Sequence, residues 1–108
     1  MNALVYDIDA SVMRAGVTVD ARQLNLAIQH AQSVAGNADR IIWLTDEPSR
    51  TDEFDKAIGY RSPFVRKSAV TNEDGGVNMT KLAELLAFHK VTMLSDTIAS
   101  FIDEPAVA

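Results

Sequence analysis

The chain has 108 residues, which is enough for one domain with one core, and its 47% hydrophobic content is that of a globular protein. It has no cysteine, which excludes disulfides and cysteine-ligated zinc and fits a reducing compartment. A net charge of −5 excludes non-specific coating of nucleic acids, because phosphate backbones would be repelled over most of the surface. The apolar stretches are too short to span a bilayer, so we expect a cytoplasmic protein without membrane contact.

The first half of the chain alternates between strand and helix patterns. Residues 3–9 begin with the buried-strand run Ala-Leu-Val-Tyr and end on two aspartates. Apolar residues then recur at helical spacing, which predicts a helix over residues 19–35 that Gly36 ends. Residues 40–46 hold the apolar run Ile-Ile-Trp-Leu, which is typical of a second buried strand.

The same alternation continues in the second half. We expect a short helix with Ser49 as its N-cap and Gly59 at its end. A third, shorter strand should follow within residues 63–70, around Phe64 and Val65. The polar residues 71–76 predict a loop. A third helix follows, with Asn78 as its cap.

The end of the chain completes the pattern, with a fourth strand over residues 91–94 and a last short helix over residues 97–102. Strands separated by helices predict a parallel sheet with right-handed crossovers and helices on both faces. The prediction is therefore one α/β domain over residues 1–108, a three-layer Rossmann-like fold of four mostly parallel strands in the order 3-2-1-4.

Acidic residues follow the two strands that this order makes neighbours. Asp7 and Asp9 come at the end of strand 1, and Asp96 comes at the end of strand 4. In open parallel sheets ligands bind beyond the carboxyl ends of the strands, where the strand order reverses. Clustered carboxylates need a cation, and hard oxygen ligands select Mg²⁺ or Mn²⁺. The alternative is that each aspartate caps a helix and keeps the sheet edge hydrated.

Three short motifs resemble the NYN family of PIN-like ribonucleases in order and spacing. They are the segments Gly59-Tyr60-Arg61, Gly76-Val77-Asn78 with its following helix, and Val91-Thr92-Met93-Leu94-Ser95-Asp96. The resemblance implies metal-dependent RNA cleavage, with Asp7 and Asp96 holding the ion and Asn78 and Glu84 orienting it or its waters. We include Asp9 in the same acidic cleft.

The sequence departs from the NYN pattern at three positions. Asn78 stands where the family has aspartate, Ala10 where it has asparagine, and Ile98 where an acidic residue is common. Each loss removes an oxygen ligand or a charge. A degenerate relative that uses its acidic face to bind and regulate or inhibit another protein is therefore the alternative from another class.

A second resemblance starts from the segment Val5-Tyr6-Asp7-Ile8-Asp9-Ala10-Ser11, which is similar to the first motif of haloacid-dehalogenase-like phosphatases. It implies that Asp7 is a nucleophile and Asp9 an acid/base. By the same resemblance Thr45, after the apolar run of strand 2, would bind phosphate. Lys67 or Lys81 would supply a cation, and Asp96 would be a metal ligand. The glycine that usually follows the second aspartate is Ala10 here.

A basic strip near the expected edge strand is the remaining candidate for substrate binding. Arg61, Arg66 and Lys67 lie beside Tyr60 and Phe64, where cations could hold an RNA phosphate and an aromatic ring could stack a base. The alternative is that these cations protect an edge strand from pairing with another chain. The partners under consideration are thus RNA, another protein, and a second copy of the chain in a homodimer.

Overall fold

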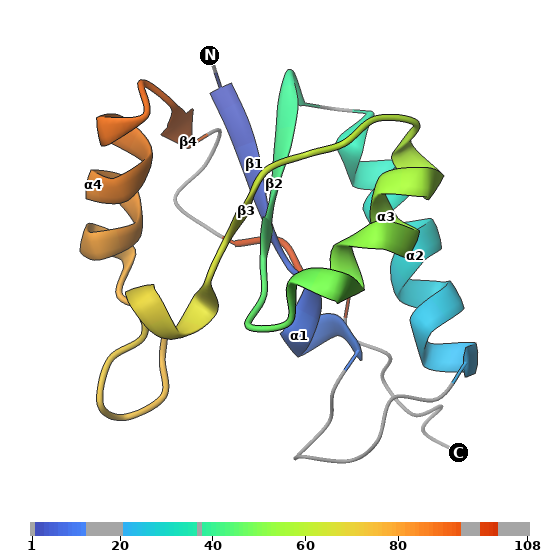
Figure 1. The fold of residues 1–108 in the computed structure, drawn as a ribbon, viewed down its shortest axis with the longest axis horizontal. Helices are drawn as coiled ribbons and strands as arrows, with labels where there is room; N and C mark the ends of the chain where they lie inside the picture. The colour runs from blue at the N-terminus through green and yellow to red at the C-terminus, as the bar shows by residue number, and fades with distance from the viewer. Residues whose placement is uncertain (1, 13–20, 37, 94–97, 102–108) are drawn as a thin grey trace, which may run out of the picture.

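A computed structural model describes residues 2–12, 21–36, 38–93 and 98–101 and shows an α/β fold (Figure 1). Its four strands form one sheet in the order β3-β2-β1-β4, and every pair of neighbouring strands is parallel. The predicted strand order is confirmed. The elements in chain order are β1 (Asn2–Asp7), α1 (Ile8–Val12), α2 (Ala21–Ala35), β2 (Arg40–Leu44), η1 (Pro48–Arg50), α3 (Thr51–Ile58), β3 (Phe64–Val65), η2 (Lys67–Val70), α4 (Met79–Phe88) and β4 (Thr92–Met93).

Helices cover both faces of the sheet, as the continuous apolar strands predict. In Figure 1, α2 and α3 lie on one side of the strands and α4 lies on the other. The core on the α2 and α3 side contains the buried residues Tyr6, Ile8, Val12, Ala27, Ala31, Ile41, Trp43 and Phe54. The core on the α4 side contains Ala3, Val5, Ile42, Leu44, Val70, Leu82 and Leu86. Alternate residues of β1 and β2 thus face opposite layers, and the chain forms the predicted three layers.

The strand register brings the carboxyl ends of β1 and β2 to the same height. Residues pair from Ala3 with Arg40 through to Asp7 with Leu44. β3 pairs only with the last two residues of β2, Phe64 with Trp43 and Val65 with Leu44. The turns that follow all three strands therefore meet at one edge of the sheet, at the lower end of the strands in Figure 1.

The first strand is shorter than predicted. β1 ends at Asp7, and Ile8–Val12 form the helix α1, which the sequence pattern did not indicate. Asp7 Oδ1 accepts the backbone N–H of Ala10 at 2.9 Å, so Asp7 starts this helix as a cap. Asp9 therefore lies in α1 and not at the end of the strand segment predicted over residues 3–9.

One other local prediction needs correction. Ser49 does not cap α3, because it lies inside the 3-10 turn η1, and the residue before α3 is Arg50. The short third strand is confirmed at Phe64–Val65, and the 3-10 turn η2 follows it. Gly59 does end α3, with a φ of 89° that favours glycine.

The described part of the expected last helix is extended. Ala99 forms a parallel bridge with Tyr6, and its N–H and C=O bond to Val5 and Asp7 of β1. Ala99 thus pairs with the part of β1 that β4 does not reach. An extended segment can form these hydrogen bonds with β1, whereas a local helix would leave the β1 backbone groups without them. The predicted helix start at residues 19–20, the strand end at Leu94 and the helix end at Ile102 lie outside the described residues. In the part of the chain that the model describes, no helix is long and apolar enough to cross a membrane.

Candidate functional site at the carboxyl ends of the strands

The first ion pair of the site joins β1 to the turn after β3. Lys67 Nζ lies 2.9 Å from Asp7 Oδ2, and the two side chains are 22% and 8% exposed. Lys67 is placed by the start of η2, where its backbone N–H bonds to the carbonyl oxygen of Thr45 at 3.3 Å. The resemblance to phosphatases left open whether Lys67 or Lys81 supplies the cation. Of these two lysines Lys67 contacts Asp7, whereas Lys81 is exposed on α4 and forms no ion pair with an aspartate in the described part of the chain.

A second set of contacts surrounds Asp9. Its Oδ1 accepts hydrogen bonds from Thr45 Oγ1 at 2.6 Å and from Arg50 Nη1 at 2.7 Å. Its Oδ2 accepts the backbone N–H of Asp46 at 2.9 Å. Thr45 is fully buried at the end of β2, so one carboxylate ties α1, the turn after β2 and η1 together. Asp9 and Thr45, to which the resemblance to phosphatases gives separate roles, are thus joined by a direct hydrogen bond.

These contacts set the ionisation of Asp9. Burial raises the pKa of its carboxyl group, but the hydrogen bonds from Thr45, Asp46 and Arg50 and the positive charge of Arg50 outweigh burial, and the net pKa is lowered. In the described arrangement Asp9 is therefore an ionised hydrogen-bond acceptor. It must be released from some of these donors and take up a proton before it can act as an acid.

An open cleft of about 700 Å³ lies over this cluster. Asp46 lies at one side and accepts the N–H of Ser68 through Oδ1 at 2.7 Å, which joins the turn after β2 to η2. The cleft is lined by Asp9, Ala10, Asp46, Glu47, Arg50, Lys67, Ser68, Thr71, Asn72 and Gly75. Asp7 does not line it. The cleft reaches Asp7 through Lys67, whose side chain both lines the cleft and contacts the Asp7 carboxylate.

The other predicted site residues lie apart from this cluster. Asn78 caps α4 by accepting the N–H of Lys81 at 3.1 Å, and its amide donates to Asn72 Oδ1 at 3.0 Å. Glu84 is exposed on α4. No hydrogen bond or ion pair of the described residues joins Asp7, Asn78 and Glu84 to one another, and Asp96 lies outside the described residues.

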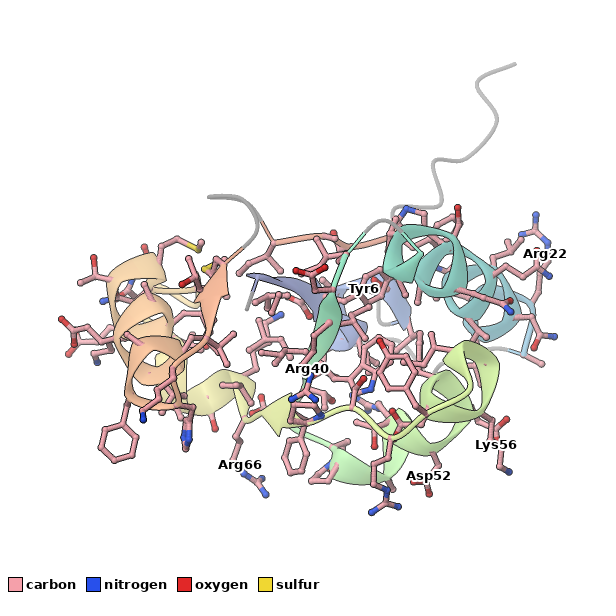
Figure 2. The ribbon with its side chains drawn as sticks, turned by 90° about the horizontal axis from the view of Figure 1, so that it is seen from above. Tyr6, Arg22, Arg40, Asp52, Lys56 and Arg66 are labelled. Carbon is pink, nitrogen blue, oxygen red and sulfur yellow. The ribbon has the colours of Figure 1, made fainter. Side chains whose placement is uncertain are left out.

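The basic strip is divided by the fold. Lys67 turns toward Asp7, whereas Arg61 and Arg66 are exposed, and the Arg66 side chain projects away from the sheet in Figure 2. Arg66 Nη1 reaches the carbonyl oxygen of Asp46 at 3.3 Å. Tyr60 and Phe64 are 45% and 42% exposed beside the edge strand β3. One cation of the predicted strip thus belongs to the cleft and two remain on the surface.

Comparison with models of known protein families, with curated proteins and with solved structures finds no match. The site must therefore be interpreted from its own chemistry.

The charges around the cleft bear on the predicted Mg²⁺ or Mn²⁺. Four carboxylates, Asp7, Asp9, Asp46 and Glu47, face two cations, Arg50 and Lys67, so the cluster has an excess of two negative charges. A phosphate group would add more, which makes a further cation necessary for tight binding. No group of three metal-binding side chains occurs among the described residues. Both carboxylate oxygens of Asp7 are engaged, one by the Ala10 N–H and the other by Lys67, and the ion stays a prediction.

Arg50 is the functional candidate that the sequence did not reveal. It lies five residues after Thr45, with no motif around it, and only the fold of η1 turns it back to Asp9. The 3-10 turn is fixed by the hydrogen bond from Arg50 N–H to the Glu47 carbonyl oxygen at 2.9 Å. Pro48 at the start of η1 was the one local signal of such a turn.

Proposed function

We propose that this cleft transfers a phosphoryl group from a phosphate monoester to water, in the manner implied by the resemblance to haloacid-dehalogenase-like phosphatases. The observation that carries the proposal is the contact of Lys67 with Asp7 at 2.9 Å beside that of Thr45 with Asp9 at 2.6 Å. These two contacts join three segments of the chain, and the backbone N–H of Lys67 also bonds to the carbonyl oxygen of Thr45. The chemistry requires a carboxylate nucleophile, a second carboxyl group, a hydroxyl and a cation, and these are the four groups present.

The first half of the proposed reaction uses Asp7 as the nucleophile. An Asp7 carboxylate oxygen attacks phosphorus, and the bond from phosphorus to the ester oxygen breaks. When the substrate displaces some of the donors from it, Asp9 takes up a proton from solvent, and it then gives this proton to the leaving alkoxide. Lys67 shifts from Asp7 to the phosphoryl oxygens as they approach, which exposes the attacking oxygen and balances the charge that collects on phosphorus.

In the second half, water restores the enzyme. Asp9, now ionised, accepts a proton from water, and the resulting hydroxide attacks the phosphorus of the acyl phosphate on Asp7. Inorganic phosphate leaves and the Asp7 carboxylate is regenerated. A bound divalent ion would neutralise phosphate oxygens and hold them in place. Thr45 is fully buried and does not line the cleft, so in the resting site its hydroxyl holds Asp9, to which it donates a hydrogen bond.

The state of Asp9 favours one competing function. A carboxylate that accepts three hydrogen bonds and has a lowered pKa has no proton to donate, which is the behaviour of a structural clamp. On that basis the second candidate is a non-catalytic protein that uses its acidic face to bind a partner. The metal-dependent ribonuclease stays a prediction, for which the described contacts of Asn78 and Glu84 give no added support.

The three functions are separated by assays on one set of variants. With Mg²⁺ present, the wild-type chain should hydrolyse an aryl phosphate, and Asp7→Asn should lower the rate by about 10³-fold or more because the nucleophile is lost. Lys81→Ala is the matched control for Lys67→Ala, and only the Lys67 change should reduce turnover. Cleavage of labelled single-stranded RNA without phosphatase activity would instead favour the nuclease. No turnover of either substrate would favour the binder.

A further inference from the structure

The residue that the proposed reaction leaves unused is Arg50. Its side chain is 26% exposed, lines the cleft, and contacts Asp9 through Nη1 at 2.7 Å. Its backbone is held firmly, since Arg50 N–H bonds to the Glu47 carbonyl oxygen and Thr51 Oγ1 bonds to the Pro48 carbonyl oxygen at 2.8 Å. The guanidinium is therefore held at the cleft by a short turn that its own hydrogen bonds stabilise.

The contact with Asp9 uses only one of the nitrogen atoms of the Arg50 guanidinium. A guanidinium carries five N–H donors in a planar fork, and only Nη1 is engaged in the described contacts. Such a fork matches two phosphate oxygens at once, which an ammonium group such as that of Lys67 cannot do. Arg50 can thus remain beside Asp9 and still donate to a ligand in the cleft.

The excess of negative charge around the cleft gives the unused N–H donors of Arg50 a role. Arg50 and Lys67 are the only cationic side chains that the described residues place in the cleft, and they face four carboxylates. A dianionic phosphate held by Lys67 alone would lie against an excess of negative charge.

We propose that Arg50 is a second phosphate-binding cation, which holds the phosphoryl group of the substrate opposite Lys67. This inference rests on the proposed phosphatase function and adds a binding residue to it. The competing explanation is that Arg50 only clamps Asp9 in position and never contacts the ligand.

The test measures binding of inorganic phosphate in the presence of Mg²⁺, by NMR titration of backbone amides, and requires no turnover. Arg50→Gln should weaken phosphate binding by about tenfold or more, the effect of losing a charge-assisted hydrogen bond. Arg50→Lys should recover part of the affinity because it keeps the charge without the fork. Arg40→Gln is the matched control, since Arg40 is exposed at the start of β2 and outside the cleft, and it should bind as the wild type does.

Asp9→Asn separates ligand binding from clamping. If Arg50 binds phosphate directly, removing the negative charge of Asp9 should leave phosphate affinity equal or higher, opposite in sign to the effect of Arg50→Gln. Equal losses in Arg50→Gln and Asp9→Asn would show a clamp and overturn the inference, as would unchanged binding by a folded Arg50→Gln. Failure of the wild type to bind phosphate would instead remove the proposed function itself. The amide spectra report in the same experiment whether each variant is folded.

Discussion

Replacing Lys67 with methionine should destabilise the protein by about 3 kcal/mol. The change leaves the Asp7 carboxylate 8% exposed with only the Ala10 N–H as a described donor. Breaking a buried ion pair from one side costs roughly 3–5 kcal/mol, and the 22% exposure of Lys67 places this pair at the lower end. The assay is urea unfolding followed by the fluorescence of Trp43, the single tryptophan, which is fully buried.

Two further variants make this result interpretable. Asp7→Asn combined with Lys67→Met should recover roughly half of the loss, because the double variant has no uncompensated charge and the new amide oxygen can still accept the Ala10 N–H. Lys56→Met is the control, since Lys56 is 77% exposed and 3.8 Å from Glu53, and it should change stability by less than about 0.5 kcal/mol. The reasoning fails if Lys67→Met is no more costly than Lys56→Met.

Two other predictions concern the segments that hold the site in place. Because the folded-state pKa of Asp9 is lowered, its ionised form stabilises the protein above the unfolded value of about 3.8, and this stabilisation is lost as the pH falls through the lower folded value. The difference in unfolding free energy between wild type and Asp9→Asn should therefore shrink below pH 3.8, and a constant difference across the acid range would contradict the assignment. Ser11→Ala removes a buried hydroxyl that donates to the Asp7 carbonyl oxygen at 2.7 Å and accepts the Phe101 N–H at 2.8 Å. Loss of both contacts should cost about 1–3 kcal/mol and speed amide hydrogen exchange at Phe101, and unchanged exchange there would count against the contact.

Hydrophobic patterning was sufficient to predict the sheet. The continuous apolar runs of β1 and β2 and the amphipathic helix between them predict a parallel pair with a crossover, and the strand order followed from the same alternation. The features that the sequence did not predict depend on individual hydrogen bonds, which the hydrophobic pattern does not reveal. Asp7 ends β1 by capping α1, and Ala99 pairs with β1 where helix was expected.

Part of the candidate site could also be predicted from the sequence. Strand ends identified Asp7 and Asp9, because side chains after parallel strands converge at one edge, and the resemblance to phosphatases identified Thr45. The sequence could not choose between Lys67 and Lys81, since that depends on the 3-10 turn η2 that follows the short strand β3. It did not indicate Arg50 at all, because a contact between residues 9 and 50 depends on tertiary folding and not on local spacing.

The central claim is that Asp7 forms a bond to phosphorus. The most direct measurement is to mix the protein with a phosphate monoester and Mg²⁺, reduce any acyl phosphate with borohydride, and locate the modified residue by peptide mass spectrometry. The account predicts homoserine in place of aspartate at position 7 and unmodified aspartate at position 9. Hydrolysis of the ester with no modification at position 7, or with modification at position 9, would contradict it.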